Sequence, residues 1–132
     1  MRASASHWSD RYVGQPYVPD EKDCGYYAEL VQREVFGHEL RLPSERAYGL
    51  RGKSKQIESL KLDYGVPTHT PQDGDGVLMI GRGKLSHVGV YCLIEGVAWV
   101  LHAARNAGQV VRHRLRELPL QGLNVEGFYK WK

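Results

Sequence analysis

The sequence lacks long hydrophobic runs and is poor in cysteine. It contains no run of about 18 apolar residues, so no membrane-spanning helix is expected. The N-terminal residues include no apolar segment of the kind found in secretory signal peptides, which predicts synthesis in the cytoplasm without a signal peptide. Only two cysteines are present, Cys24 and Cys92, and no C-x-x-C pair occurs. A structural zinc site with four ligands is therefore not expected.

An excess of charge of one sign is also lacking, because 18 Lys and Arg face 15 Asp and Glu, for a net charge of +3. Short basic runs at residues 51–55 and 112–116 are typical of a solvated surface, so nucleic acid is not expected as a partner. The proportions of 42% hydrophobic and 25% charged residues are those of a globular domain. With no internal repeat or linker, residues 1–132 are predicted to form a single domain.

The first half of the chain has the pattern of α-helices. Asp23 is a suitable N-cap for a helix over residues 24–36, and Gly37 is a suitable stop. Apolar residues fall on one face of this helix, which predicts that it packs against a core. Two further helical stretches are expected, one after Ser44 and one from about Ser54 to Asp63, ended by Gly65 and Pro67.

The second half has the pattern of short strands separated by turns. A segment rich in turn residues, 71–76, precedes the first strand. The expected strands are Val77–Ile80, Ser86–Ile94, Val97–Ala103, Gln109–His113 and Val125–Trp131. Helices followed by antiparallel strands indicate an α+β fold, in which N-terminal helices pack on one side of a small antiparallel sheet of five to six strands.

Cys24 is the first candidate for chemistry, because it lies at the first position of the expected helix. The positive end of a helix dipole favours the thiolate, and the thiolate is the nucleophilic form of cysteine. A buried structural cysteine is the alternative interpretation of the same position.

His87 is the candidate base. Side chains alternate along a strand, which places His87 and Gly89 on one face and Cys92 on the other with the apolar residues. Cys92 is thus expected in the core, and a disulfide bond between Cys24 and Cys92 is not expected. His87 would line a groove, where Gly89 allows a substrate to approach closely. A merely structural role is the alternative for a lone strand histidine.

His102, at the end of the next expected strand, would lie beside His87 in an antiparallel pair and could fix the orientation of its ring. Tyr17, shortly before Cys24, could join the Cys24 backbone N–H in stabilising an oxyanion. A metal site formed by Cys24, His87 and His102 is a further alternative. The other histidines are expected at the surface: His7, His38, His69 and His113.

Several short motifs occur in order along residues 8–132. They are Tyr12-Val13-Gly14-Gln15-Pro16-Tyr17-Val18, Asp23-Cys24, Glu34-Val35-Phe36-Gly37, Asp73-Gly74-Asp75-Gly76-Val77-Leu78-Met79, Ser86-His87-Val88-Gly89-Val90-Tyr91, Val100-Leu101-His102-Ala103 and Val125-Glu126-Gly127-Phe128-Tyr129-Lys130-Trp131. In their order and spacing the chain resembles the NlpC family of papain-like cell-wall cysteine peptidases, and in particular its bacteriophage tail branch.

The resemblance implies a Cys-His-His triad, with Cys24 as nucleophile, His87 as general base and His102 as the orienting residue. It also implies that Tyr17 is the oxyanion and substrate tyrosine. Members of the family hydrolyse the amide between D-glutamate and a diamino acid in peptidoglycan stem peptides, without a metal or an organic cofactor. Phage members act at the tail tip or help to assemble the tail. Action in the virion tail or at the cell wall and periplasm, with other tail proteins as partners, is therefore expected.

The sequence departs from the family after the cysteine. Gly25 comes one place early, and Tyr26 stands where the family has glycine. Tyr26 is thus expected at the substrate groove, which it would narrow or adapt to another substrate. Two alternative functions follow: a structural tail-tip assembly module that keeps the peptidase fold, and the same chemistry on a different amide.

Overall fold

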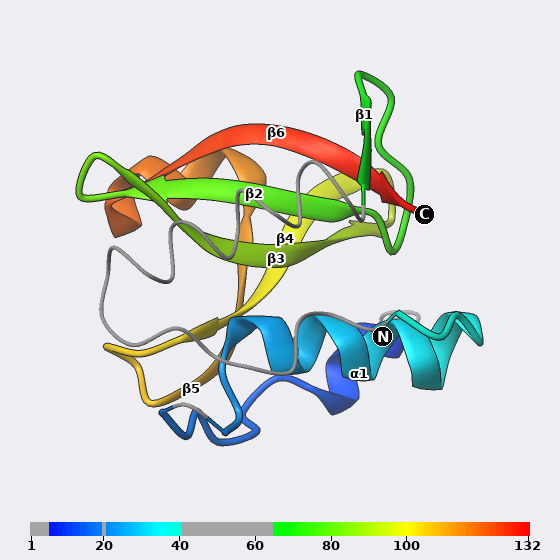
Figure 1. Cartoon of the computed structure of the whole chain (residues 1–132), viewed down its shortest axis with the longest axis horizontal. Coiled ribbons are helices and arrows are strands. Elements are labelled where there is room, and N and C mark those ends of the chain that lie inside the picture. Colours follow the sequence, from blue (N-terminus) through cyan, green and yellow to red (C-terminus); the bar gives the residue numbers. More distant parts are fainter. Residues whose placement is uncertain (1–5, 20, 41–64) are drawn as a thin grey trace, which may run out of the picture.

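The computed structural model describes residues 6–19, 21–40 and 65–132, which contain one antiparallel sheet of six strands (Figure 1). The predicted α+β class is confirmed. The described elements are η1 (Trp8–Arg11), α1 (Cys24–Phe36), β1 (Gly65–Thr68), β2 (Gly76–Gly81), β3 (Lys84–Ile94), β4 (Val97–Ala104), β5 (Gln109–Arg114), η3 (Leu115–Gln121) and β6 (Leu123–Trp131), where η marks a 3-10 helix. The strand order in the sheet is β1-β6-β2-β3-β4-β5.

Helix α1 begins and ends at the residues that the sequence predicts. The Asp23 carboxylate accepts a hydrogen bond from the Tyr26 N–H at 3.0 Å, which satisfies one of the N–H groups left open at the start of the helix. Gly37 ends the helix in the left-handed conformation, with a φ of 63°, which glycine adopts at little cost. The face of α1 that carries Ala28 and Val31 is buried against the sheet. Complete burial of a side chain such as Val31 stabilises the fold by about 1.5–3 kcal/mol.

Five strands, β2 to β6, match the expected strands in order and within two residues at each end. Strand β1 is an addition that the sequence pattern did not predict. It pairs with β6 at the edge of the sheet, with Gly65 opposite Trp131 and Pro67 opposite Tyr129. Proline has no N–H to donate to a second neighbour, so an edge strand is the part of a sheet that accepts it.

Both faces of the sheet are buried. On the face that carries α1, the main cluster includes Val88, Val90 and Cys92 from β3 (hereafter the α1 cluster). On the other face lies a second cluster, closed by a residue of η3: Val77, Met79, Tyr91, Val100 and Leu118. Figure 1 shows α1 and η3 on opposite sides of the sheet.

Gly89 corrects the prediction of an open groove along β3. A Cβ at this position would lie 2.7 Å from Cγ1 of Val100 and 2.9 Å from the Leu101 carbonyl oxygen. Real Cβ atoms do not approach other atoms so closely, and a close-packed interior leaves little room for the neighbours to move away. The absence of a side chain at Gly89 therefore serves the packing of the second cluster, and this part of the face is filled by protein.

The segment before α1 lies along the outer edge of β5. The Gly14 N–H donates to the Val110 carbonyl at 2.9 Å, and the Val110 N–H donates to the Gln15 carbonyl at 2.8 Å. Further along, the Tyr17 N–H donates to the Gly108 carbonyl at 3.0 Å. These bonds satisfy edge groups that would otherwise face solvent or another chain.

The helical stretches expected after Ser44 and over residues 54–63 lie outside the described residues. Within the described ranges, no helix is both long enough and apolar enough to cross a membrane.

Candidate active site

Cys24 is the first residue of α1, and only 4% of its surface is exposed. It belongs to the α1 cluster, which also contains Leu101 and Ala103 of β4. These two residues flank His102 along the strand. The thiol is free, as is that of Cys92.

The start of α1 lies at the end of the sheet where β4 ends and β3 begins. The Tyr27 hydroxyl, in the first turn of α1, donates to the Pro16 carbonyl at 2.5 Å, and Pro16 forms a β-bridge with Gln109 at the start of β5. Because β4 and β5 are joined by one hairpin, this contact fixes the first turn of α1 near the last residues of β4. Strand β3 is antiparallel to β4, so it begins at the same end.

Cys92 lies in the core, as the alternation along β3 predicts. Its side chain is fully buried in the α1 cluster, and burial is the main cause that raises the pKa of its thiol to about 12. Cys92 therefore stays protonated at neutral pH and is a poor nucleophile. Of the two cysteines, only Cys24 is a candidate for covalent chemistry.

His87 and His102 are joined by a hydrogen bond. His87 Nε2 lies 2.8 Å from His102 Nδ1, with the two rings nearly perpendicular. The predicted proximity of these two histidines is confirmed, and their part in catalysis stays a prediction. Because Nε2 faces His102, Nδ1 is the ring nitrogen of His87 that faces away from His102.

Both imidazoles leave the sheet from the face of the second cluster. His102 alternates with Leu101 and Ala103, which belong to the α1 cluster, and His87 lies opposite Met79 of the second cluster. Cys24 belongs to the α1 cluster. A reaction between the thiol and His87 therefore requires the thiol to reach past the end of the sheet at which β3 begins. That Cys24 and His87 act together stays a prediction from the sequence.

His113 corrects the prediction that it lies at the surface. Its Nδ1 lies 3.0 Å from Nε2 of His102, and its side chain is partly buried. The contact between His102 and His113 could have been predicted from the sequence. A hairpin centred on Asn106 and Ala107 pairs His102 with Val111, which puts His113 two residues further along the same face. His87, His102 and His113 thus form a histidine chain across β3, β4 and β5.

His102 is the buried member of the histidine chain, with 3% of its surface exposed. Burial, and secondarily the charge of the neighbouring His113, lower the pKa of His102 to about 4. The ring is therefore neutral at neutral pH and carries a single N–H. It can donate to only one of its two histidine neighbours and must accept from the other.

The lowered pKa of His102 predicts a loss of stability in acid. A histidine in the unfolded chain has a pKa of about 6.5. At pH values between this pKa and the native pKa of about 4, the unfolded chain binds a proton that the native state does not. The stability that depends on neutral His102 is fully present above this pH range. It is lost as the pH falls through the range, by up to about 3 kcal/mol, since one pKa unit corresponds to roughly 1.4 kcal/mol. Urea unfolding of the wild type and His102→Asn, from neutral pH to about pH 4, measures the effect. The stability difference between the two proteins should shrink in acid, and a constant difference would contradict the assignment.

Tyr17 lies at the same end of the sheet as the first turn of α1, because its N–H is bound to Gly108 in the β4–β5 hairpin. It is partly buried and packs against the α1 cluster. Tyr26 is also partly buried, and its ring packs edge to face on Tyr27 with centroids 4.9 Å apart. Much of the extra bulk of Tyr26 is therefore taken up by packing within the first turn of α1.

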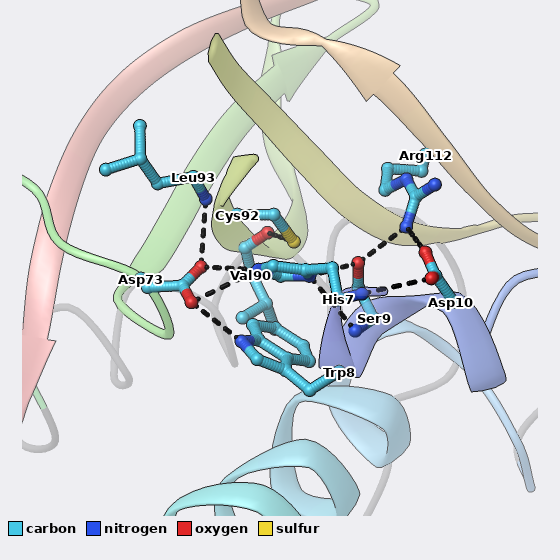
Figure 2. Close-up of polar contacts among 9 residues, drawn as sticks. All are labelled: His7, Trp8, Ser9, Asp10, Asp73, Val90, Cys92, Leu93 and Arg112. Atoms are coloured by element: carbon cyan, nitrogen blue, oxygen red, sulfur yellow. Dashed lines mark hydrogen bonds and ion pairs between the residues drawn. The ribbon is translucent and has the colours of Figure 1, made fainter. Parts of the chain in front are cut away.

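The expectation that the remaining histidines lie at the surface holds for His69, which is exposed, and is wrong for His7 and His38. The ring of His38 is partly buried and bonds to the Lys132 carbonyl at 2.8 Å. His7 is partly buried in a polar network between η1 and the sheet (Figure 2).

In this network the Asp73 carboxylate binds His7, Trp8 and Leu93 (Figure 2). Both of its carboxylate oxygens lie 3.1 Å from His7 Nε2, and Oδ2 accepts from the Trp8 indole at 2.8 Å. Oδ1 also accepts from the Leu93 N–H of β3 at 2.8 Å. The carboxylate thereby fastens η1 to the sheet through groups more than sixty residues apart in sequence.

Ser9, His7 and Asp73 have the connectivity of a Ser-His-Asp triad, since Ser9 Oγ lies 2.7 Å from His7 Nδ1. Two observations exclude this function. Ser9 has no exposed surface, and its Oγ accepts a hydrogen bond from Arg112 at 2.7 Å. These contacts hold the oxygen inside the protein, where it cannot meet a substrate carbonyl. The arrangement is structural.

Asp73→Asn is expected to destabilise the fold by about 1–3 kcal/mol, because an amide group replaces a carboxylate that accepts from several donors. The loss is no larger because solvent screens the Asp73 side chain, which is 36% exposed. Urea unfolding measures the loss, with Glu21→Gln at an exposed position as the matched control. An equal effect of the two substitutions would show that Asp73 does not hold η1 in place.

Among the described residues, no group of three or more His, Cys, Asp or Glu side chains is arranged to hold a metal ion. No family model, no curated protein and no solved structure matches the chain. The resemblance to the NlpC family is therefore one of sequence motifs alone.

Proposed function

We propose that the chain is a cysteine peptidase of the NlpC type, which hydrolyses the amide between D-glutamate and a diamino acid in peptidoglycan stem peptides. The observation that supports it most is the hydrogen bond of 2.8 Å between His87 Nε2 and His102 Nδ1. His87 also lies near the start of β3, at the end of the sheet where α1 starts with Cys24. A base held by a third group is what nucleophilic catalysis by cysteine needs.

In the proposed reaction, His87 takes the proton of the Cys24 thiol and Sγ attacks the carbonyl carbon of the D-glutamyl amide. The Cys24 N–H and the Tyr17 hydroxyl stabilise the oxyanion. His87 then protonates the nitrogen of the diamino acid, which leaves as an amine. Water, deprotonated by His87, attacks the thioester and releases the D-glutamyl carboxylate and the free thiol.

The setting proposed for this activity is a bacteriophage or prophage tail, where local hydrolysis opens the cell wall for genome entry. The substrate is the peptidoglycan stem peptide, and other tail proteins are the proposed partners. Neither a metal ion nor an organic cofactor takes part in the proposed reaction.

A second function, a structural module for tail-tip assembly, is favoured by two observations. Cys24 is only 4% exposed, and Tyr26 occupies the place of the family's glycine. A thiol that stays covered would leave the fold as a docking unit. Such a module would co-purify with other virion proteins and would not cleave the wall.

Digestion of purified peptidoglycan by the full chain, followed by mass spectrometry of the released peptides, tests the proposal. The expected products are stem peptides that end in D-glutamate, together with fragments that begin with the diamino acid. Release at another amide would keep the chemistry and change the substrate. No release by folded protein, with or without its tail partners, would overturn the peptidase proposal and support the structural module.

A further inference from the structure

The histidine chain contains one contact that the proposed reaction does not use. His102 Nδ1 faces His87 Nε2 at 2.8 Å, and on the other side of the ring His102 Nε2 faces His113 Nδ1 at 3.0 Å. The central ring is buried, and the outer two are partly buried. Both nitrogens of His102 are therefore engaged by other imidazoles.

The position of one proton on His102 decides what His87 can do. With the proton on Nδ1, His102 donates to His87 Nε2, and the proton of a neutral His87 must then sit on Nδ1. With the proton on Nε2, His102 donates to His113 Nδ1 and accepts from the His87 Nε2–H. Only in the second case does His87 Nδ1 keep the lone pair that a base requires.

We propose that His113 is a positioning residue, whose Nδ1 accepts the Nε2 proton of His102 and so fixes the tautomer in which His87 Nδ1 is the basic atom. The same tautomer serves the later step, because His102 Nδ1 can still accept a hydrogen bond when His87 is doubly protonated. The catalytic consequence rests on the proposed peptidase function. The tautomer itself is a property of the folded chain.

The pairing of β4 and β5 places His113 beside His102. His113 lies opposite Val100, and His102 lies opposite Val111, so the two histidines are diagonal neighbours on one face. Arg112 and Arg114, on either side of His113, both lie over the Trp99 ring, at 5.8 and 5.3 Å from its centroid. Because side chains alternate along a strand, these guanidinium groups leave β5 from the opposite face.

The tautomer can be read by nitrogen-15 NMR of the imidazole rings in the labelled full chain at neutral pH, with the His102 signals identified by their loss in His102→Asn. The wild type is expected to show His102 protonated at Nε2. His113→Asn should keep this form, because its Oδ1 is an acceptor near the place of Nδ1. His113→Leu removes the acceptor and should bring up the form protonated at Nδ1. A wild-type His102 protonated at Nδ1, or an unchanged tautomer in His113→Leu, would overturn the inference.

The rate of alkylation of Cys24 by iodoacetamide gives the matching chemical readout. His113→Leu should lower the rate roughly tenfold, and His113→Asn should restore it to within about twofold of the wild type. Equal rates in His113→Leu and the wild type would contradict the positioning role. If His113→Leu does not fold, the spectra and alkylation rates of the wild type and His113→Asn still show whether His102 is protonated at Nε2 and whether an acceptor at position 113 maintains this form.

Failure of this inference can be told apart from failure of the proposed function. A wild type with His102 protonated at Nε2 that never cleaves stem peptides would refute the peptidase and leave the tautomer standing. Cleavage by a wild type with His102 protonated at Nδ1 would support the peptidase and refute the proposed tautomer.

Discussion

Replacing Cys24 by alanine is expected to abolish the release of stem peptides from peptidoglycan, with a loss of at least about 10³-fold. Without Sγ no thioester can form, and the oxyanion groups alone give only slow hydrolysis by water. The change removes one sulfur atom from the α1 cluster, so a stability cost of about 1–2 kcal/mol is expected and the chain should stay folded. Quantitative mass spectrometry of the released peptides measures the loss, with circular dichroism to verify folding.

Cys92→Ala is the matched control, because it removes the same atom from a buried cysteine of the same cluster. Its thiol is held protonated and has no part in the proposed reaction. This variant should therefore release stem peptides at a rate close to that of the wild type. Wild-type turnover by Cys24→Ala would remove Cys24 from the mechanism.

The second large effect is expected for His87→Gln, with a fall in peptide release of about 10²–10⁴-fold. Glutamine can still bond to His102, but it cannot take a proton from the thiol. The same substitution should slow the alkylation of Cys24 by iodoacetamide at neutral pH, because the proposed base no longer takes the proton of the thiol as it reacts. His69→Gln is the control, since His69 is exposed.

Peptide release and alkylation separate two roles of His87. If both fall, His87 serves the thiol. If peptide release falls while alkylation is unchanged, His87 acts on the substrate alone, and the proposed pair with Cys24 is wrong. A variant that is like the wild type in both assays would remove His87 from the site.

Local signals in the sequence were sufficient to predict most of the fold. Helix α1 has a capping aspartate and a terminating glycine at its two ends, and these signals act within a few residues of one another. Strands β2 to β6 have alternating or continuous apolar patterns bounded by turns. Strand β1 was missed because Gly65 and Pro67 are poor strand formers, and only the pairing with β6, far away in sequence, makes them a strand.

The burial of both sheet faces could not be predicted from β3 alone. Its pattern indicates one apolar face, whereas the second face is covered by η3, whose Leu118 lies far along the chain. Gly89 therefore looked like a place for substrate, and the structure shows that Val100 and Met79 occupy the space beside it. A residue without a side chain gives no information on which neighbour fills the gap.

The candidate site was predictable where strand pairing decides the contact, and not where side chains meet over long distances. The proximity of His87 and His102 follows from two neighbouring strands of one sheet. The network around Asp73 joins η1 to a residue more than sixty positions away, and no local pattern around His7 indicates such a partner. The contact between His102 and His113 is an intermediate case. The register of the β4–β5 hairpin predicts it, but only after His102 has been chosen as a candidate residue.

Mass spectrometry of the acyl-enzyme tests whether Cys24 is the nucleophile. The full chain is mixed with a stem-peptide substrate, quenched in acid within the first turnovers and digested to peptides. The peptide containing Cys24 is expected to carry the D-glutamyl part of the substrate as a thioester, and His87→Gln is expected to accumulate far less of it. Steady cleavage without any adduct on Cys24, or an adduct on another residue, would show that Cys24 is not the nucleophile.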